Sequence, residues 1–508
     1  MSEPRFIDEI AGRLAREAAD RIVVADDHAA LTGAAFAAAV EDAARAFCAL
    51  GLGAGDRCLL ALPNSVALAA GMLAASRCGA WAVPVNPRLT AAEQASIRAH
   101  ARPRLALARD PAMAGHAAKR IAIGGTELCA GIDGAAPAEP DEADPAHRVA
   151  ALIYTSGTTG EPKGVMLTHA NLLFVAQGSS ALRRIGAADR VYCALPMSHV
   201  FGLASVFLGS LYAGARLDLA GAFDALRVAG ALADDAITVF QGVPTMYQRL
   251  LELADRRGAP LAAPRLRYLS TGGAPLDPGL KARVEAMLAV ALQNGYGLTE
   301  TAPTVSTTRI EAPAADDSCG PPLEGVEVRI ADPADGRALA AGGVGEIQVR
   351  GPGVMRGYYR APEATRAVIG ADGWFRSGDL GRLDGRGHLY VVGRLKELII
   401  RSGFNVYPPE VEAALTQHPD VALAGVVGRK VAGNEEVVAF LEPRPGRTID
   451  VADVAAYAAS RLAPYKRPAR YVVLTSLPVT GAAKIRKAEL ARIAAALGDE
   501  PPPPGAMA

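Results

Sequence analysis

The chain has 508 residues, half of them hydrophobic, and its 53 Lys and Arg balance 53 Asp and Glu, so that the formal net charge is zero. A chain of this length exceeds what one hydrophobic core usually supports, which predicts two or more domains. The neutral balance provides no global field that would favour nucleic acid or a membrane surface as a partner.

The cysteines and the most apolar segments indicate the compartment. Six cysteines are spread along the sequence without close pairs, which predicts neither a disulfide framework nor a zinc site. Residues 1–21 carry both charge signs and lack the apolar segment of a secretory signal. The most apolar stretch, residues 58–83, is interrupted by Pro63, Arg77 and Gly79, so we expect no membrane span. We therefore expect a cytoplasmic protein.

Short apolar runs alternate with helical segments through the first half of the chain. The predicted strands are residues 57–62, 81–85, 149–153, 191–195, 237–240 and 266–270. The predicted helices between them are residues 66–76, 170–183 and 245–254. This alternation predicts parallel strands with crossover helices, and hence an α/β fold whose large N-terminal domain contains doubly wound sheets.

The pattern changes in the second half. Short β-like runs at residues 326–330, 345–350 and 388–392 predict a β-rich section that closes the N-terminal domain, residues 1–392. Helices at 406–417 and 451–462, with strands at 421–427 and 436–441, then predict a small mobile α+β C-terminal domain, residues 397–498. The proline-rich tail, residues 499–508, is expected to be disordered.

A glycine- and hydroxyl-rich loop, YTSGTTGEPKG, occupies residues 154–164. Its glycines permit close backbone approach, its hydroxyls donate hydrogen bonds, and Lys163 adds a positive charge, so the loop can hold phosphate. It is not a Walker A loop, because Lys163 precedes Gly164 where that motif requires Ser or Thr. An ordinary surface loop is the alternative that composition alone allows. The candidate phosphate-binding residues are Thr155, Ser156, Gly157, Thr158, Thr159, Gly160 and Lys163.

The loop closely resembles the signature loop of the adenylate-forming superfamily, which comprises acyl-CoA synthetases, aryl-CoA ligases, luciferases and peptide-synthetase adenylation domains. Five further motifs follow in the family's order: TGGAPL at 271–276, NGYGLTE at 294–300, GWFRSGDL at 373–380, GRLKELI at 393–399 and PVTGAAKIRK at 478–487. The resemblance spans nearly the whole chain. It implies an ATP-dependent, AMP-forming acid–thiol ligase, closest to the acyl-CoA and aryl-CoA ligases.

The resemblance also implies how the nucleotide is bound. Tyr296 would stack on the adenine, Thr299 would contact the α-phosphate and Glu300 would hold Mg²⁺, roles that suit a π-face, a hydroxyl and a hard oxygen ligand. Alone, Glu300 would be interpreted as a solvated surface acid. The other nucleotide-binding residues implied by the resemblance are Gly272, Gly273, Ala274, Pro275, Asn294, Gly295 and Gly297.

The last motifs carry the remaining implied roles. Asp379 would accept hydrogen bonds from the ribose hydroxyls, Arg394 would lie near the ribose or phosphates, and Lys396 would stand in a hinge at residues 393–396. The family's catalytic lysine falls on Lys484. A cation placed between the attacking carboxylate and the α-phosphate stabilises charge in the transition state, which is the role expected of Lys484.

PMSHVFGL, residues 196–203, resembles the segment that lines the acyl pocket and the thiol tunnel of these ligases. We favour a pocket role for His199 over the alternative of proton transfer. Amino-acid-activating relatives have an aspartate where this chain has Gly202, so a substrate ammonium would lack its partner. The other implied pocket positions are uncharged: Phe201, Phe240, Gly242, Thr245, Thr271, Gly272, Gly295 and Ala302. They predict an apolar monocarboxylic acid, either aryl or fatty.

The acceptor of the activated acid is expected to be CoA. No carrier domain follows Lys487 in the sequence; a separate carrier protein is the first alternative and a luciferase-like oxidation a remote one. A non-catalytic nucleotide-binding relative would be expected to lack Lys484, Glu300 or Asp379, and all three are present. The expected ligands are therefore ATP, Mg²⁺, CoA and a small carboxylic acid, and only family habit suggests a homodimer.

Overall fold

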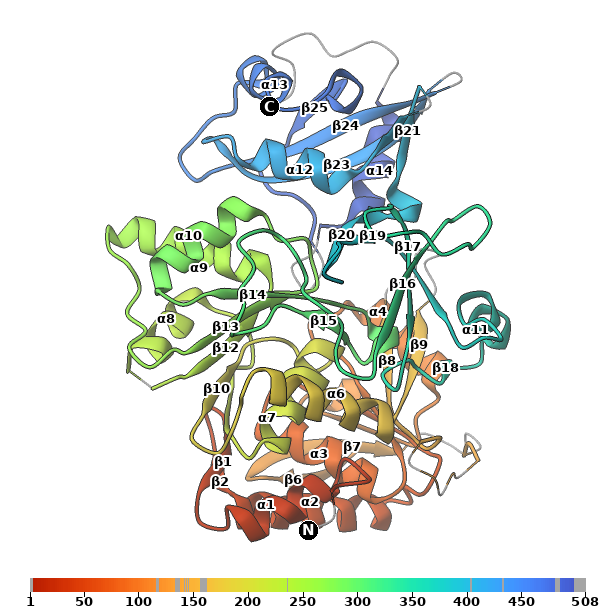
Figure 1. Cartoon of the computed structure of the whole chain (residues 1–508). Helices are drawn as coiled ribbons and strands as arrows, with labels where there is room; N and C mark the ends of the chain where they lie inside the picture. The colour runs from red at the N-terminus through yellow and green to blue at the C-terminus, as the bar shows by residue number, and fades with distance from the viewer. Residues whose placement is uncertain are drawn as a thin grey trace. The chain divides into compact units, whose positions relative to one another are not determined.

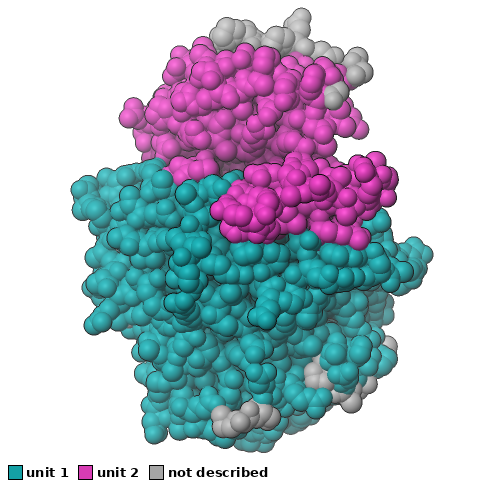
Figure 2. All heavy atoms as spheres, viewed as in Figure 1, with its two compact units in different colours: residues 1–276, 280–328, 349–376 teal, residues 277–279, 329–348, 377–508 magenta. Residues whose placement is uncertain are grey.

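The computed structural model describes residues 3–115, 118–132, 138–140, 142, 144, 146–155, 162–234, 236–402, 404–431, 434–479 and 485–497. The chain forms two compact units, coloured separately in Figure 2. Unit 1 contains Met1–Leu276, Leu280–Val328 and Val349–Arg376, and unit 2 contains Asp277–Gly279, Arg329–Gln348 and Ser377–Ala508. None of the helices in the described ranges combines the length and the apolar character needed to cross a membrane.

Unit 1 contains two eight-stranded sheets (Figure 1). The first has the order β15-β14-β13-β12-β10-β11-β1-β2. Its strands are β1 (Ile22–Ala25), β2 (Ala30–Thr32), β10 (Arg190–Cys193), β11 (Arg216–Leu219), β12 (Val239–Gly242), β13 (Tyr268–Gly272), β14 (Leu292–Gly297) and β15 (Thr304–Thr307). The six central strands of this order, β14, β13, β12, β10, β11 and β1, pair in parallel. The strands β2 and β15 pair antiparallel with their neighbours and form the two edges.

The second sheet has the order β18-β9-β8-β4-β3-β5-β7-β6. Its strands are β3 (Arg57–Ala61), β4 (Trp81–Pro84), β5 (Leu105–Ala108), β6 (Lys119–Ile123), β7 (Thr126–Ile132), β8 (Val149–Thr155), β9 (Lys163–Thr168) and β18 (Gly357–Tyr358). The four central strands, β8, β4, β3 and β5, pair in parallel. The outer strands β18, β9, β7 and β6 pair antiparallel with their neighbours. The predicted parallel core is therefore present in both sheets.

Helices connect and cover these strands. They are α1 (Glu9–Glu17), α2 (Gly33–Ala49), α3 (Val66–Arg77), α4 (Ala91–Ala101), α5 (Pro111–Ala114), α6 (His169–Leu182), α7 (Gly209–Tyr212), α8 (Ala225–Asp234), α9 (Pro244–Arg257), α10 (Pro278–Leu288) and α11 (Pro362–Val368), with a π-helix η1 (Phe201–Leu208) and a 3₁₀ turn η2 (Thr299–Thr301). Ser65 caps the N-terminus of α3, since its hydroxyl accepts the Leu68 N–H at 3.2 Å, and the helix is buried from Val66 to Ser76. This burial explains the apolar composition of residues 66–76.

Unit 2 contains smaller sheets. A four-stranded sheet has the order β16 (Glu327–Ala331), β17 (Gly345–Arg350), β19 (Phe375–Leu383) and β20 (Leu389–Arg394). It is followed by the hairpin β21 (Ile399–Arg401) and β22 (Phe404–Val406), and by the sheet β23 (Val421–Val431), β24 (Asn434–Pro443) and β25 (Arg470–Val473). The helical segments are η3 (Leu395–Glu397), α12 (Pro408–Thr416), α13 (Val451–Ala459), η4 (Pro464–Lys466) and α14 (Lys487–Ala496).

Unit 2 includes a segment that precedes the C-terminal part of the chain, residues 329–348 and 377–392. The domains of residues 1–392 and 397–498 stay a prediction. The strands of this segment pair mainly with one another, which gives them the character of a separate small sheet. The hinge at residues 393–396 stays a prediction.

Two cysteines are closer than their sequence positions indicated. The Sγ atoms of Cys48, next to the end of α2, and Cys78, at the end of α3, lie 3.2 Å apart, and both thiols are free. The pair forms because α2 and α3 pack against each other. The spacing of cysteines in the sequence therefore does not show which of them are neighbours in space.

His169, the first residue of α6, makes stability depend on pH. It is 1% exposed, and its Nδ1 accepts the N–H of Ile7 at 3.2 Å. Burial, and secondarily the charge of Arg148, lowers the pKa of His169 to about 3. In the unfolded chain the His169 imidazole binds a proton near pH 6.5. The contribution of neutral His169 to the free energy of unfolding is therefore complete above that pH, and it declines below it by about 1.4 kcal/mol per pH unit.

We expect urea unfolding between pH 7 and 4 to show this decline, and His169→Asn to reduce the pH slope by about one proton. Asparagine retains an acceptor for the Ile7 N–H but does not titrate in this range. An identical slope in the variant would contradict the assignment of this proton to His169.

Candidate active site

The predicted phosphate loop, residues 154–164, is the connection of a β-hairpin. The strands β8 and β9 pair antiparallel, with Thr155 opposite Lys163. The Tyr154 hydroxyl lies 2.8 Å from His100 Nδ1, and burial raises the pKa of Tyr154, which keeps the phenol neutral. The loop is thus presented by two paired strands and not by a helix N-terminus. Ser156, Gly157, Thr158, Thr159 and Gly160 lie outside the described residues.

Three side chains from distant parts of the sequence meet beside this hairpin. The strand β18 pairs with β9 and places Tyr358 opposite Val165. The Tyr358 hydroxyl donates to Glu300 Oε1 at 2.8 Å, and Lys163 Nζ lies 5.1 Å from the centre of the Tyr358 ring. Desolvation, together with the Glu300 charge, raises the pKa of Tyr358, so the hydroxyl remains a donor. A cation and a carboxylate therefore approach the same phenol at the base of the loop.

The ends of β13 and β14 bring the two predicted adenine-binding segments together. Gly272 and Gly295 are paired across these strands. The turn of residues 273–275 follows β13, and Tyr296, which is 9% exposed, comes directly after Gly295. Ligands of α/β sheets bind at the carboxyl ends of the strands, where these residues lie.

The neighbouring candidates have different surroundings. Asn294 Nδ2 donates to the carbonyl oxygen of Asp317 at 2.8 Å, so this amide anchors a loop of the chain. Thr299 is buried and begins η2, which contains Glu300. A side chain at Gly297 would place its Cβ 1.7 Å from the Pro303 carbonyl oxygen, so this position accepts only glycine.

Some of the predicted pocket residues lie together. A Cβ on Gly272 would lie 3.6 Å from Phe201 Cε1, so the aromatic ring of η1 lies against Gly272, which is paired with Gly295. His199 Nδ1 accepts the N–H of Phe201 at 3.4 Å. Ala302 is buried at the end of η2 with φ 63°.

Phe240 and Thr271 do not join this group. The Phe240 ring lies 5.7 Å from Tyr247 of α9, in the core cluster on the helix side of the sheet. Thr271 alternates with Gly272 along β13 and therefore points to the opposite side from it. Thr245 is the second residue of α9, the helix that also carries Tyr247.

In unit 2, Asp379 and Arg394 are paired. They stand opposite each other on β19 and β20, and Arg394 Nε lies 3.0 Å from Asp379 Oδ1. Asp379 is 5% exposed. Lys396 lies two residues further on, in η3, and is exposed. Lys484 lies outside the described residues.

Lys487, in the same motif as Lys484, is held by two carboxylates. Its Nζ lies 2.9 Å from Glu412 Oε1 and 3.0 Å from Glu397 Oε2. Burial opposes its charge, but the two carboxylates outweigh this effect and raise the pKa of Lys487. Lys487 therefore joins α14 to α12 and η3 as a structural cation.

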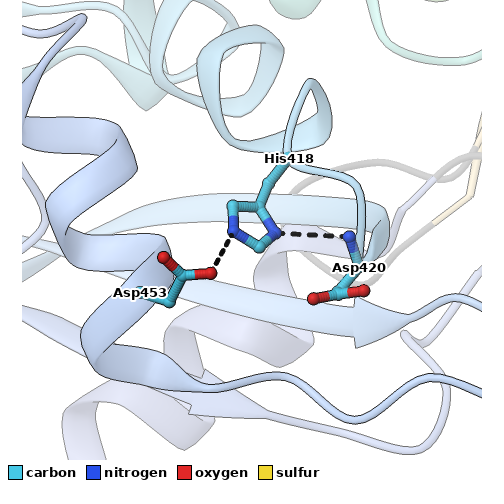
Figure 3. A group of neighbouring side chains, drawn as sticks. All are labelled: His418, Asp420 and Asp453. Atoms are coloured by element: carbon cyan, nitrogen blue, oxygen red, sulfur yellow. Dashed lines mark hydrogen bonds and ion pairs between the residues drawn. The ribbon is translucent and has the colours of Figure 1, made fainter.

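Figure 3 shows His418 between Asp420 and Asp453, an arrangement that resembles a metal site. His418 Nε2 lies 3.2 Å from Asp453 Oδ2, and His418 Nδ1 accepts the N–H of Asp420 at 3.2 Å. Both ring nitrogens are thus engaged, and the cluster ties the end of α12 to α13. It offers no open imidazole nitrogen to a metal.

Comparison with known proteins identifies the family. The AMP-binding enzyme family matches residues 12–359, and the AMP-binding enzyme C-terminal domain matches residues 410–484. This chain belongs to the AMP-binding enzyme family. The predicted family, fold class and enzyme class are therefore confirmed.

Named relatives of this AMP-binding enzyme cover almost its whole length. A feruloyl-CoA synthase of Amycolatopsis sp is 37% identical over 486 residues, which are 94% of this chain and 97% of the relative. 4-Coumarate–CoA ligase 5 of Oryza sativa subsp. japonica is 34% identical over 469 residues, 88% of this chain and 87% of the relative. The o-succinylbenzoate CoA synthetase of Bacillus subtilis, solved with the acyl-adenylate intermediate OSB-AMP, has a TM-score of 0.82 and 30% identity and covers 95% of this chain and 97% of that chain.

Gly202 is a point where this AMP-binding enzyme excludes a side chain. A Cβ there would lie 2.3 Å from the Pro196 carbonyl oxygen and 2.8 Å from that of Leu195. We expect Gly202→Ala to lower the free energy of unfolding by about 1–3 kcal/mol, because the backbone must shift. An aspartate at this position would meet the same obstacle.

Urea denaturation of Gly202→Ala measures this effect, and Gly230→Ala in α8 is the matched control. A Cβ at Gly230 meets nothing within 4 Å, so that change should stabilise the helix by about 0.5–1 kcal/mol. Equal stability of Gly202→Ala and the unmodified chain would show that the backbone at residue 202 relaxes freely.

Two features of the site were not predicted from the sequence. Tyr358 was not predicted, because its partner Glu300 is distant in sequence and only the pairing of β18 with β9 brings them together. Gln241 and Ser270 were not predicted either; both are buried, and their side-chain polar atoms have no partner among the residues that the structure describes. The alternation of side chains along β12 and β13 was the available signal, since it assigns residues 240 and 241 to opposite faces.

Proposed function

We propose that this enzyme is an ATP-dependent, AMP-forming acid–CoA ligase that converts a monocarboxylic acid to an acyl-adenylate and then to an acyl-CoA. The observation that carries the proposal is the meeting of Lys163, Tyr358 and Glu300 at the base of the 154–164 hairpin. It places a cation and an anchored carboxylate beside the loop whose composition suits phosphate. The named CoA ligases among the relatives support the second half of the reaction.

The residues of the family's motifs bind the nucleotide in this proposal. The loop of residues 154–164 holds the β- and γ-phosphates, and Tyr296 stacks on the adenine beside the turn of residues 273–275. Thr299 contacts the α-phosphate. Asp379 accepts hydrogen bonds from the ribose hydroxyls, and its ion pair with Arg394 fixes the orientation of the carboxylate.

Glu300 is the residue that would hold Mg²⁺. Its carboxylate is a hard oxygen ligand, is partly exposed, and has Oε1 fixed by the Tyr358 hydroxyl, which fits the binding of this ion. When bound, Mg²⁺ neutralises negative charge on the phosphates. Tyr358 and Lys163 are this chain's own contribution, because they set the position of the carboxylate and add a positive charge.

Lys484 supplies the cation for the first half-reaction in this proposal. The attacking carboxylate and the α-phosphate are both anions, so a lysine between them stabilises the charge that develops as the new bond forms. Lys487 is the other lysine near the end of this motif, and Glu397 and Glu412 already engage it. This geometry supports the choice of Lys484.

The second half-reaction requires a rearrangement. We propose that residues 397–498 rotate about the hinge at 393–396, which contains Lys396, and move Lys484 away so that the CoA thiol can reach the acyl-adenylate.

His199 and Phe201 line the path to the acid. The relatives that act on feruloyl and coumarate groups favour an aryl acid over a fatty acid.

Pyrophosphate release from Mg·ATP tests the proposal. The acids are benzoates, cinnamates and fatty acids from C2 to C16, each with and without CoA. We expect release with a subset of these acids, and acyl-CoA only when CoA is present. Adenylate formation without any transfer to CoA would favour a carrier protein as acceptor. No release with any acid would refute the ligase function.

A further inference from the structure

Gln241 is buried in β12 with both ends of its amide unpaired. The residue is 1% exposed, and neither Nε2 nor Oε1 has a hydrogen-bond partner among the described residues. Ser270 in β13 is 4% exposed, and its Oγ also lacks a partner there. Buried polar groups without partners are costly and call for a specific explanation, such as a ligand.

These two side chains lie next to each other on one face of the sheet. Gln241 is paired with Ser270, and Ser270 with Gln293, across parallel strands without a break in register. Paired residues of neighbouring strands point to the same side. Phe240 packs on Tyr247 of α9, so Gln241 points away from that helix.

The same face carries the glycine pair of the acyl pocket. Gly272 and Gly295 follow Ser270 and Gln293 by two residues, which places them about 7 Å closer to the strand ends. They contribute no side chains, and the Phe201 ring lies against Gly272. From the strand ends inward, the face therefore presents first a stretch without side chains and then a row of polar groups.

We infer that Gln241 and Ser270 bind a hydroxyl group at the end of the substrate acid opposite its carboxylate. This inference rests on the proposed function, in which the carboxylate reacts at the strand ends. An amide and a hydroxyl each donate and accept, which matches a phenolic or alcoholic hydroxyl. A second charged group at this depth would require an opposite charge, which neither residue supplies. The substrate class is thus a hydroxylated monocarboxylic acid, whereas the sequence predicted a predominantly apolar aryl or fatty monocarboxylic acid.

Matched acid pairs test the inference with the full-length enzyme. The pairs are cinnamic and 4-hydroxycinnamic acid, benzoic and 4-hydroxybenzoic acid, and octanoic and 8-hydroxyoctanoic acid. For at least one pair, kcat/KM of pyrophosphate release should be higher with the hydroxylated acid by about tenfold or more. The acid that lacks the hydroxyl leaves the buried side chains of Gln241 and Ser270 without a hydrogen-bond partner.

The variant Gln241→Met keeps the length of the side chain and removes both polar atoms. We expect it to reduce the preference for the hydroxylated acid to about threefold or less, mainly through a loss with that acid. Gln248→Met on α9, outside the site, is the activity control and should retain the preference. Gln293→Met is the stability control, because Gln293 Oε1 accepts the Thr308 hydroxyl at 2.6 Å. It should lower the melting temperature, whereas Gln241→Met should maintain or raise it.

Thermal shifts with the acids alone give a readout that does not depend on catalysis. The hydroxylated acid should raise the melting temperature of the unmodified enzyme more than that of Gln241→Met. The inference would be overturned if the enzyme activated acids without any preference for the hydroxylated member of a pair. It would also be overturned if Gln241→Met left that preference unchanged. Either result would leave the ligase function standing. A failure to activate any acid would overturn the ligase function, and equal thermal shifts in both proteins would then overturn the inference as well.

Discussion

Lys484→Ala is expected to slow acyl-adenylate formation by about 10²- to 10³-fold, the usual cost of removing one group that stabilises transition-state charge. Thioester formation from a supplied acyl-adenylate should change by less than about threefold, because the proposed rotation removes this lysine from the site before CoA attacks. Pyrophosphate release measures the first step. Single-turnover formation of acyl-CoA from synthetic acyl-adenylate measures the second.

Lys430→Ala is the matched control for Lys484→Ala. Lys430 is an exposed lysine of β23 in the same unit, so its loss should leave both half-reactions unchanged. Lys487→Ala is unsuitable as a control, since Lys487 joins Glu397 to Glu412 and its removal would leave half-buried Glu412 without its cation. Equal loss of both half-reactions in Lys484→Ala would contradict the proposed division of labour.

The parallel core of this enzyme was predictable because local pattern and tertiary environment agree there. The strands β3 and β4 and the helix α3 between them are almost wholly buried, so their continuous apolar sequence gives both the elements and the crossover. The C-terminal strands β23 and β24 were predicted for the same reason. Their predicted lengths were too short, because the hairpin extends into polar residues such as Lys430 and Glu435.

The sequence could not supply features that depend on distant pairings. The antiparallel addition of β9 and β18 to the second sheet turns the phosphate loop into a hairpin and brings Tyr358 to Glu300. The resemblance to the family also placed Phe240 in the pocket. The register of β12 with β13 shows that its neighbour Gln241, and not Phe240, is on the face of the sheet that carries the glycine pair.

Tyr358→Phe is expected to lower kcat/KM for Mg·ATP by about tenfold and to raise the Mg²⁺ concentration required for half-maximal rate. The hydroxyl of Tyr358 donates to the charged Glu300 Oε1 at 2.8 Å, and a hydrogen bond to a charged group contributes about 1.5–3 kcal/mol. Phenylalanine keeps the ring beside Lys163 and removes only this donor. Glu300→Gln, which removes the charge itself, should have the larger effect, about 10²-fold or more.

Tyr359→Phe separates this role from a general loss of stability. Tyr359 is the next residue, is similarly buried, and donates its hydroxyl to Glu139 Oε1 at 2.6 Å, so its loss removes a comparable hydrogen bond elsewhere. Titration of Mg²⁺ at fixed ATP, with melting temperatures measured in parallel, distinguishes the two tyrosines. A shifted Mg²⁺ requirement in Tyr358→Phe alone supports the positioning of Glu300 by Tyr358. Equal Mg²⁺ requirements in both variants would mean that Tyr358 stabilises only the pairing of β18 with β9.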